Sequence, residues 1–367
     1  MRSMKSFCTA SSASSPSVAV IAQSDEFALV KAPVFSSFTS DDFEKIAQDL
    51  ILEKKLEKQI RTGKYRSMDT ATYQYFIQTP LYCKTGPSEN YTLYKAAGES
   101  IPLDKINSSS IPVLYVLNRE WNAAYAELRE GMIDRIRTFI NNKELDNAKK
   151  LTVTLLDLIL FEHDEKSIKG LEEVVEVLFT ATSQSKEMVL NLVPLLEQNL
   201  TLGLHSARIM ALALKFCIKN NYSLKDSKLL CTSALLHDIG KTMLSTHLIN
   251  ANPYTLTRDE DVQEFQLHPQ IGFDLLEDCV IKDKVIGFGA LEHHERIDGS
   301  GFPVGKRKVS FLGQVIGIFD AYDTLRNGQN LSGVSYSSIE ALKIMKKECD
   351  AGKFSKELFE TFAYSLL

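Results

Sequence analysis

At residues 234–241 the chain reads ALLHDIGK, an apolar stretch that contains the adjacent pair His237 and Asp238 and ends in a glycine and a lysine. Burying an ionisable pair without compensation costs several kcal/mol, so the pair needs partner groups around it. The stretch therefore predicts a buried polar site to which other parts of the chain contribute.

Five of the seven histidines fall into one spaced series together with two aspartates. The series runs through His205, His237-Asp238, His268, His293-His294 and Asp320. Successive groups are separated by about the length of a helix and its connection, so each would lie on its own helix and point to a common centre. Imidazole suits transition metals and a bridging carboxylate suits a hard divalent cation. The set therefore favours iron or manganese over a structural zinc, which more often recruits cysteine.

The adjacent pair predicts how two divalent transition-metal ions, iron ahead of manganese, would be shared. Neighbouring residues on a helix differ in direction by about 100°, so His237 and Asp238 cannot point the same way. We predict that Asp238 bridges both ions and that His237 binds one of them. The other ligands divide into His205 with Asp320 for one ion, and His268, His293 and His294 for the other.

A second motif begins at the histidine doublet, where residues 293–303 read HHERIDGSGFP. With HDIGK at 237–241, HSARI at 205–209, FDAYD at 319–323 and FSKEL at 354–358, it resembles the HD-GYP family of metal-dependent phosphodiesterases. The resemblance covers about residues 200–367. It implies an all-α metal domain in which a hydroxide held by two metals opens the bacterial second messenger cyclic di-GMP to linear pGpG, and then to GMP.

Two residues depart from the family pattern. Phe302 stands where the family has the tyrosine of Gly-Tyr-Pro, which removes a hydroxyl but keeps an aromatic face. Thr201 stands four residues before His205, where members with three metals carry a glutamate, so we expect two metals. Two alternatives stay open: a catalytically weak protein that binds cyclic di-GMP and signals, and an HD-type phosphohydrolase acting on another nucleotide. The second alternative would not need the doublet followed by DGSGFP.

The resemblance also suggests substrate contacts. Asp238 and Lys241 are the expected catalytic residues, with the Lys241 ammonium meeting a phosphate oxygen; the alternative is an exposed lysine at a helix end. Gly299 and Gly301 would let the loop of Phe302 approach substrate, although any tight turn also requires glycine. The basic run 306–308 is expected to be a solvated face.

Two acids and an arginine near the ligands have expected supporting roles. Glu295 and Asp323 suit acceptors for histidine N–H groups, or surface charges. Arg208 is expected to be an internal ion-pair partner rather than a substrate contact.

The rest of the chain predicts further units before an all-α domain at 196–367. Residues 1–24 are expected to be a flexible tail, and residues 25–119 a small α+β domain. That domain would hold a helix from Ser40 through Leu56 and strand-like pieces at 72–77, 91–94 and 112–117. It would regulate the chain or dock a signalling partner, or serve as a structural appendage. Residues 120–195 are expected to be a helical connector, with Ala124, Leu128, Met132 and Ile136 recurring at helical spacing.

Composition narrows the class of protein. A length of 367 residues fits two domains, and 44% hydrophobic and 24% charged residues are ordinary for a globular protein. A net charge of −5 argues against a partner that is a nucleic-acid polymer. Six cysteines without a CxxC pair indicate reduced thiols, and no stretch approaches the roughly 18 apolar residues of a membrane span. We therefore expect a cytoplasmic protein; a homodimer is left open.

Overall fold

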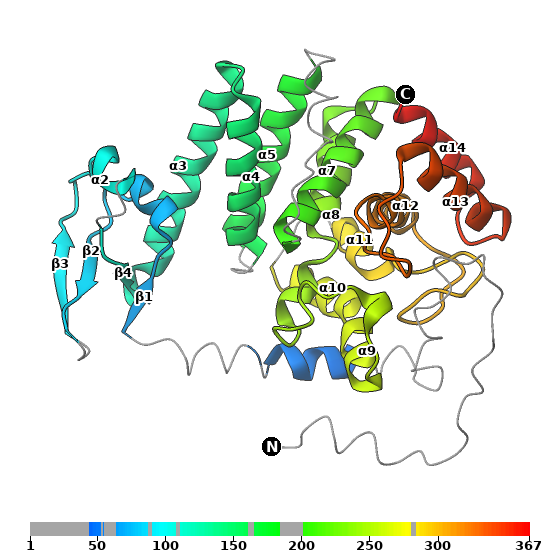
Figure 1. The fold of residues 1–367 in the computed structure, drawn as a ribbon, viewed down its shortest axis with the longest axis horizontal. Coiled ribbons are helices and arrows are strands. Elements are labelled where there is room, and N and C mark those ends of the chain that lie inside the picture. The colour runs from blue at the N-terminus through cyan, green and yellow to red at the C-terminus, as the bar shows by residue number, and fades with distance from the viewer. Residues whose placement is uncertain are drawn as a thin grey trace.

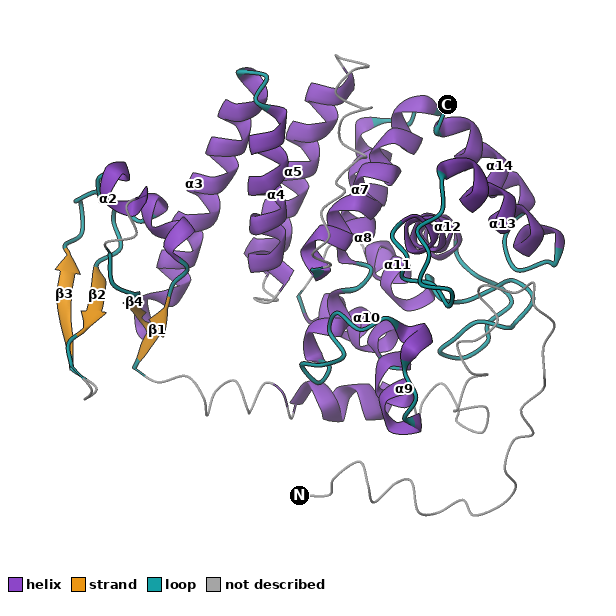
Figure 2. Cartoon of the chain, viewed as in Figure 1, coloured by secondary structure: helices purple, strands orange, loops and turns teal. Residues whose placement is uncertain are grey.

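The computed structural model describes residues 44–52, 54, 64–86, 90–107, 111–160, 165–183, 201–279 and 284–367. Four features of the sequence lie outside these residues: the predicted tail at 1–24, the expected helix start at Ser40, the expected helix end at Leu56, and His163, which is the other histidine that the ligand series leaves out. An N-terminal region with a four-stranded antiparallel sheet and helices precedes an all-helical C-terminal domain, which confirms the predicted fold class (Figure 2).

The sheet has the strand order β1-β4-β2-β3. Its strands are β1 (Tyr65–Ser67), β2 (Leu81–Lys84), β3 (Tyr91–Lys95) and β4 (Leu114–Leu117), and each neighbouring pair is antiparallel. The strand-like pieces predicted at 91–94 and 112–117 correspond to β3 and β4. Leu114 and Val116 are fully buried, and Tyr115 between them faces the opposite side because successive side chains alternate along a strand.

The strand predicted at 72–77 is wrong. Residues Thr70–Tyr75 form the 3-10 helix η3, because the Asp69 carboxylate caps it by accepting a hydrogen bond from the amide of Ala71. Tyr73 is buried, and its hydroxyl accepts from the amide of Leu114 at 2.8 Å. The tyrosines and threonines that suggested a strand therefore belong to two turns of 3-10 helix that pack against the sheet.

Three long helices follow the sheet. They are α3 (Trp121–Asn141), α4 (Leu145–Leu160) and α5 (Glu165–Ser183), after the short elements α2 (Leu103–Asn107) and η4 (Asn118–Glu120). The expected apolar stripe of α3 is buried. α4 contacts α7 (Leu202–Lys219) and α5 contacts α8 (Leu224–Leu236), so these helices lie between the sheet and the C-terminal domain (Figure 1). The domain boundaries at 119 and 195 stay predictions.

The C-terminal domain is built around α12 (Phe311–Arg326), which contacts α7, α8, α11 (Gly287–Glu292), α13 (Ser338–Asp350) and α14 (Lys356–Ser365). Helices α9 (Asp259–Gln266) and α10 (His268–Asp278) and the 3-10 turns η5 (Ile239–Met243), η6 (Pro253–Thr255) and η7 (Lys284–Ile286) complete it. Serine or threonine side chains cap α7, α8, α12, α13 and α14 at their first turns. Thr201 is one of these caps, accepting from the amide of Leu204 at 3.1 Å.

Among the described residues, no helix combines the length and the apolar character needed to cross a membrane. The described cysteines are free, and four of the five, Cys217, Cys231, Cys279 and Cys349, are buried.

Candidate metal centre

Five separate elements bring the seven predicted ligands together. His205 lies on the first turns of α7, the pair His237-Asp238 joins α8 to η5, and His268 begins α10. His293-His294 directly follow α11, and Asp320 lies within α12. His237, His268 and His293 are fully buried. The expected convergence on a common centre matches the structure. The expectation that each group lies on its own helix holds for His205, His268 and Asp320, whereas His237-Asp238 and His293-His294 lie in turns that directly follow α8 and α11.

Hydrogen bonds to the backbone fix the orientation of three rings. Nδ1 of His237 donates to the carbonyl of Ala234 at 2.8 Å, and Nδ1 of His268 donates to that of Phe265 at 2.6 Å. Nδ1 of His293 likewise donates to the carbonyl of Ala290 at 2.8 Å. Because a carbonyl only accepts, Nδ1 carries the proton in each ring. The Nε2 lone pairs are thereby directed into the cluster.

These lone pairs face one another. Nε2 of His268 lies 3.3 Å from Nε2 of His293, and Nε2 of His237 lies 3.2 Å from Nε2 of His205. Between His268 and His293, two unprotonated imidazole nitrogens at such a distance repel unless a cation lies between or beside them. His205, whose pKa is raised to about 9, can instead donate its Nε2 proton to His237 in the metal-free protein. The arrangement is therefore one that a bound metal ion would stabilise.

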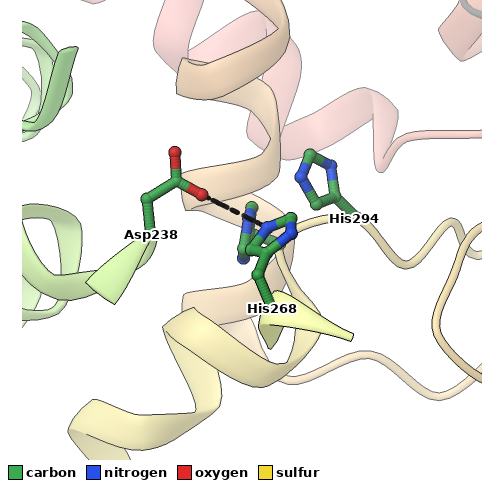
Figure 3. Close-up of side chains that lie close together, drawn as sticks. Asp238, His268 and His294 are labelled. Carbon is green, nitrogen blue, oxygen red and sulfur yellow. Dashed lines mark hydrogen bonds and ion pairs between the residues drawn. The ribbon is translucent and has the colours of Figure 1, made fainter. Parts of the chain in front are cut away.

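Asp238 joins the two histidine pairs. Its Oδ1 lies 3.2 Å from Nε2 of His268 and 3.5 Å from Nε2 of His293, and Figure 3 shows the carboxylate directed at His268. Its Oδ2 lies 3.4 Å from Nε2 of His237 and 3.5 Å from Nε2 of His205. Two ligand groups, one on each oxygen, therefore share this single carboxylate.

The remaining predicted ligands close the cluster. His294 joins Asp238, His268 and His293 in one group of ligand atoms that lie within 4.8 Å of one another. Asp320 lies 3.3 Å from Nε2 of His205 and 3.8 Å from Nδ1 of His294, so it borders both groups. Nε2 of His294 is buried and has no hydrogen-bond partner among the described residues. An orphaned acceptor beside this donor set fits a metal site, and the buried His/Asp clusters suit one.

Burial and charge set the protonation of the cluster. Burial lowers the pKa of His237 to about 3 and that of His268 to about 4, so both rings are neutral and able to bind a metal at neutral pH. Burial alone would also lower the pKa of His205, but hydrogen bonds with Asp320 and Asp323 raise it to about 9. Burial disfavours the charge on Asp238, yet Lys241 and the histidines hold its pKa well below the usual range.

The outer contacts of His205 match two predictions. Its Nδ1 donates to Oδ2 of Asp323 at 3.0 Å, and Arg208 holds the same carboxylate through Nε at 2.8 Å. All three side chains are buried. Asp323 as a histidine acceptor and Arg208 as an internal ion-pair partner are confirmed. Such carboxylates fix ring orientation and raise ligand basicity.

Lys241 lies at the edge of the cluster. Its Nζ is 2.5 Å from Oδ2 of Asp238 and 5.1 Å from the ring centre of Phe265, and its side chain is 14% exposed. This excludes the alternative of an exposed lysine at a helix end. Its phosphate contact stays a proposal.

The predicted role of Glu295 is wrong. Its carboxylate is 4% exposed and reaches no histidine; it accepts from the amides of Val304 at 3.0 Å and Lys306 at 2.8 Å. Glu292, also buried, accepts from the amide of Ser310 at 2.6 Å and pairs with the Lys306 ammonium. Two buried glutamates therefore hold the loop after the doublet. Lys306, 40% exposed, belongs to that arrangement, whereas Arg307 and Lys308 are exposed, as expected for a solvated face.

Glycines let this loop fold back on its own chain. Gly299 has a φ of +86°, and a Cβ on Gly301 would collide with the backbone of His294 and Arg296. A tight turn accounts for both. Phe302 is 5% exposed and stacks on His294, with ring centres 4.4 Å apart at 23°. The loop thus lies against the cluster through an aromatic contact.

Gly240 is a positioning residue that the sequence did not reveal. A Cβ there would collide with the carbonyl oxygen of His268 and with the amide nitrogen of Gly272. The backbone of η5 therefore lies directly against the start of α10, which brings Asp238 to His268. The Gly-Lys that ends the opening motif was the available signal.

His247, one of the two histidines that the ligand series leaves out, lies outside the cluster. Its side chain is 57% exposed, and Nε2 lies 3.1 Å from Oδ1 of Asp261. It lies at the surface and has no part in the site.

Comparisons with known proteins identify the kind of domain that holds this cluster. A model of the HD domain family matches residues 190–358. The chain is 32% identical over 132 residues to the cyclic di-GMP phosphodiesterase PA4108 of Pseudomonas aeruginosa, a match that covers 35% of this chain and 31% of that protein. It is 27% identical over 169 residues to the cyclic di-GMP phosphodiesterase response regulator RpfG of Xanthomonas campestris pv. campestris, covering 45% and 38%.

Two further matches extend the picture. A Vibrio cholerae protein, the 3'3'-cGAMP-specific phosphodiesterase 1, is 27% identical over 158 residues, covering 42% of this chain and 36% of that protein. The solved structure of Bd1817, a HDG"Y"P protein from Bdellovibrio bacteriovorus, matches 82% of this chain and 99% of its own with a TM-score of 0.58. Its 19% identity supports the fold alone.

The chain spans about a third of the length of the curated relatives it matches. It carries an HD domain related to the HD-GYP cyclic di-GMP phosphodiesterases at about 30% identity.

Proposed function

We propose that this chain is a metal-dependent phosphodiesterase that hydrolyses cyclic di-GMP to linear pGpG, and then to GMP. The main observation in support is that two groups of histidine ligand atoms share the buried carboxylate of Asp238. Relatives named as cyclic di-GMP phosphodiesterases support the substrate. Because the matches cover only part of those proteins, cyclic di-GMP as the substrate of this chain is part of the proposal.

The proposed cofactors are two divalent ions, iron or manganese. One would be held by His205, His237 and Asp320, the other by His268, His293 and His294, with Asp238 shared. Two ions held by these residues would supply a water of lowered pKa and would stabilise charge on the phosphoryl oxygens. Asp323 and Arg208 keep the His205 ring oriented for this task.

The chain's own side chains would position the substrate. Lys241 carries an ammonium at the partly exposed edge of the cluster and would bind a phosphate oxygen. The adjoining wall of the substrate site would be formed by Gly299, Gly301 and Phe302. The ring of Phe302 would stack on a guanine base of the substrate. Because that ring is buried against His294, such stacking requires the loop to shift.

Two other activities are the competing candidates. The relative named for 3'3'-cGAMP favours a second cyclic dinucleotide as substrate. A binding protein with weak catalysis is favoured by Phe302, which lacks the hydroxyl of the family's tyrosine.

The decisive assay incubates the full chain, loaded anaerobically with Fe²⁺ or with Mn²⁺, with cyclic di-GMP or 3'3'-cGAMP and resolves the products by chromatography. We expect pGpG from cyclic di-GMP, no product from Asp238→Ala, and unchanged turnover in the control His247→Ala. Faster turnover of 3'3'-cGAMP would support the second substrate. Tight binding of cyclic di-GMP without any product would support the binding protein instead.

A further inference from the structure

A cavity of about 410 Å³ lies on the N-terminal sheet, away from the metal centre. It is lined by Lys64, Tyr65, Tyr82, Leu117, Asn118 and Arg119. Figure 1 shows the sheet at one end of the molecule, with α3, α4 and α5 between it and the C-terminal helices. The volume falls within the roughly 300–1,000 Å³ that is typical of small-molecule sites.

Tyrosines form one wall of this cavity. Tyr82 and Tyr115 are cross-strand partners, and Ser67, two residues after Tyr65, also pairs with Tyr115. Paired side chains project to the same face of an antiparallel sheet, so the three tyrosines share one face. Tyr65 meets Tyr82 edge-on, with ring centres 5.3 Å apart. This face is opposite to the one that buries Leu114 and Val116, so its rings are not part of the core.

Two cations stand at the same end of the sheet. Lys64 and Arg119 flank the paired residues Tyr65 and Leu117, and the amide of Asn118 donates to the carbonyl of Lys64 at 3.0 Å. No lining residue is acidic. The Arg119 side chain is 79% exposed, and its pairing with Glu120 at 3.5 Å is a surface contact that a ligand anion can replace.

We propose that this cavity binds a nucleoside monophosphate, with the phosphate between Lys64 and Arg119 and the base against Tyr82. A phosphate forms charge-assisted hydrogen bonds with ammonium and guanidinium groups. A base stacks on an aromatic side chain whatever its sequence identity, because every base has a π-face. An inorganic anion would leave the rings unused, and a neutral aromatic compound would leave the cations unused. The site is independent of the activity proposed for the metal centre.

Isothermal titration calorimetry of the full chain with GMP at low ionic strength tests the proposal. Inorganic phosphate and guanosine are the comparison probes. GMP should bind more tightly than either, because only GMP uses both the cations and the rings.

Variants assign the binding to the cavity. Lys64→Ala and Arg119→Ala should each weaken GMP binding about tenfold, as expected for the loss of one charged contact. Both side chains lie on the surface, so circular dichroism should remain that of the wild type. The matched control Lys84→Ala removes an exposed lysine from β2 that does not line the cavity, and should bind like wild type.

Equal GMP affinity in wild type, Lys64→Ala and Arg119→Ala would overturn the proposal, because any bound nucleotide would then occupy the His/Asp cluster. Phosphate or guanosine binding as tightly as GMP would overturn it as well. If the chain binds GMP in this cavity but shows no phosphodiesterase activity, that result would contradict the proposed function without contradicting the proposed GMP site.

Discussion

Glu295 offers the sharpest test of how the loop beside the metal centre is held. Glu295→Gln keeps the shape of the side chain but replaces one acceptor oxygen by an NH₂ group. One of the amides of Val304 and Lys306 then faces a donor instead of an acceptor. A hydrogen bond to a charged group contributes about 1.5–3 kcal/mol, and an unsatisfied buried donor costs about 1–3 kcal/mol. Burial already raises the pKa of Glu295, which offsets part of that sum.

We therefore expect Glu295→Gln to lower the free energy of unfolding by about 2–4 kcal/mol, measured by denaturant titration. Metal content should stay at the wild-type level, because the carboxylate reaches no histidine. The matched control is Glu260→Gln, whose side chain is 67% exposed and should change stability by no more than about 0.5 kcal/mol. Equal stability of the two variants would refute the reasoning.

Three further predictions concern the cluster and its surroundings. Gly240→Ala should abolish metal binding, measured by elemental analysis, because its Cβ would push η5 away from His268. Phe302→Tyr should raise either turnover or affinity by up to about tenfold, since one added hydrogen bond contributes about 0.5–1.5 kcal/mol; unchanged kinetics would place the loop away from the substrate. The stability of metal-free protein, measured by thermal unfolding, should fall as the pH drops below about 6.5. The reason is that the lowered pKa values of His237 and His268 keep both rings neutral in the folded state, while the same histidines take up protons in the unfolded chain. It should also fall above that pH as His205, with its pKa raised to about 9, loses its proton, so a flat profile between pH 5 and 9 would contradict both assignments.

The ligand set was accessible from sequence because its chemistry is local. An ionisable pair in an apolar stretch and a histidine doublet before a glycine-rich loop are readable without tertiary contacts. Their spacing by whole helices then predicts convergence, and the structure brings His205 and Asp320 together, although 115 positions separate them along the chain.

The contacts that support the site could not be predicted from the sequence in the same way, because they depend on which segment of backbone lies against each side chain in the folded protein. Nothing near Glu295 indicates that its partners are two loop amides. The glycine at 240 signals a close approach of backbone, but it does not indicate that α10 is the element that approaches. In the N-terminal region, Tyr73 has the β-propensity of a strand residue. The cap at Asp69 and the bond from Leu114 to the Tyr73 hydroxyl make it part of a helical turn.

The most direct test of the central claim is the metal content of purified full-length protein, compared between wild type and Asp238→Ala. One carboxylate lies between two histidine groups, so its removal should affect both ions. Elemental analysis should give about two iron or manganese ions per chain in wild type and close to none in Asp238→Ala, with His247→Ala unchanged. A wild-type value near zero after reconstitution, or full metal content in Asp238→Ala, would contradict the account.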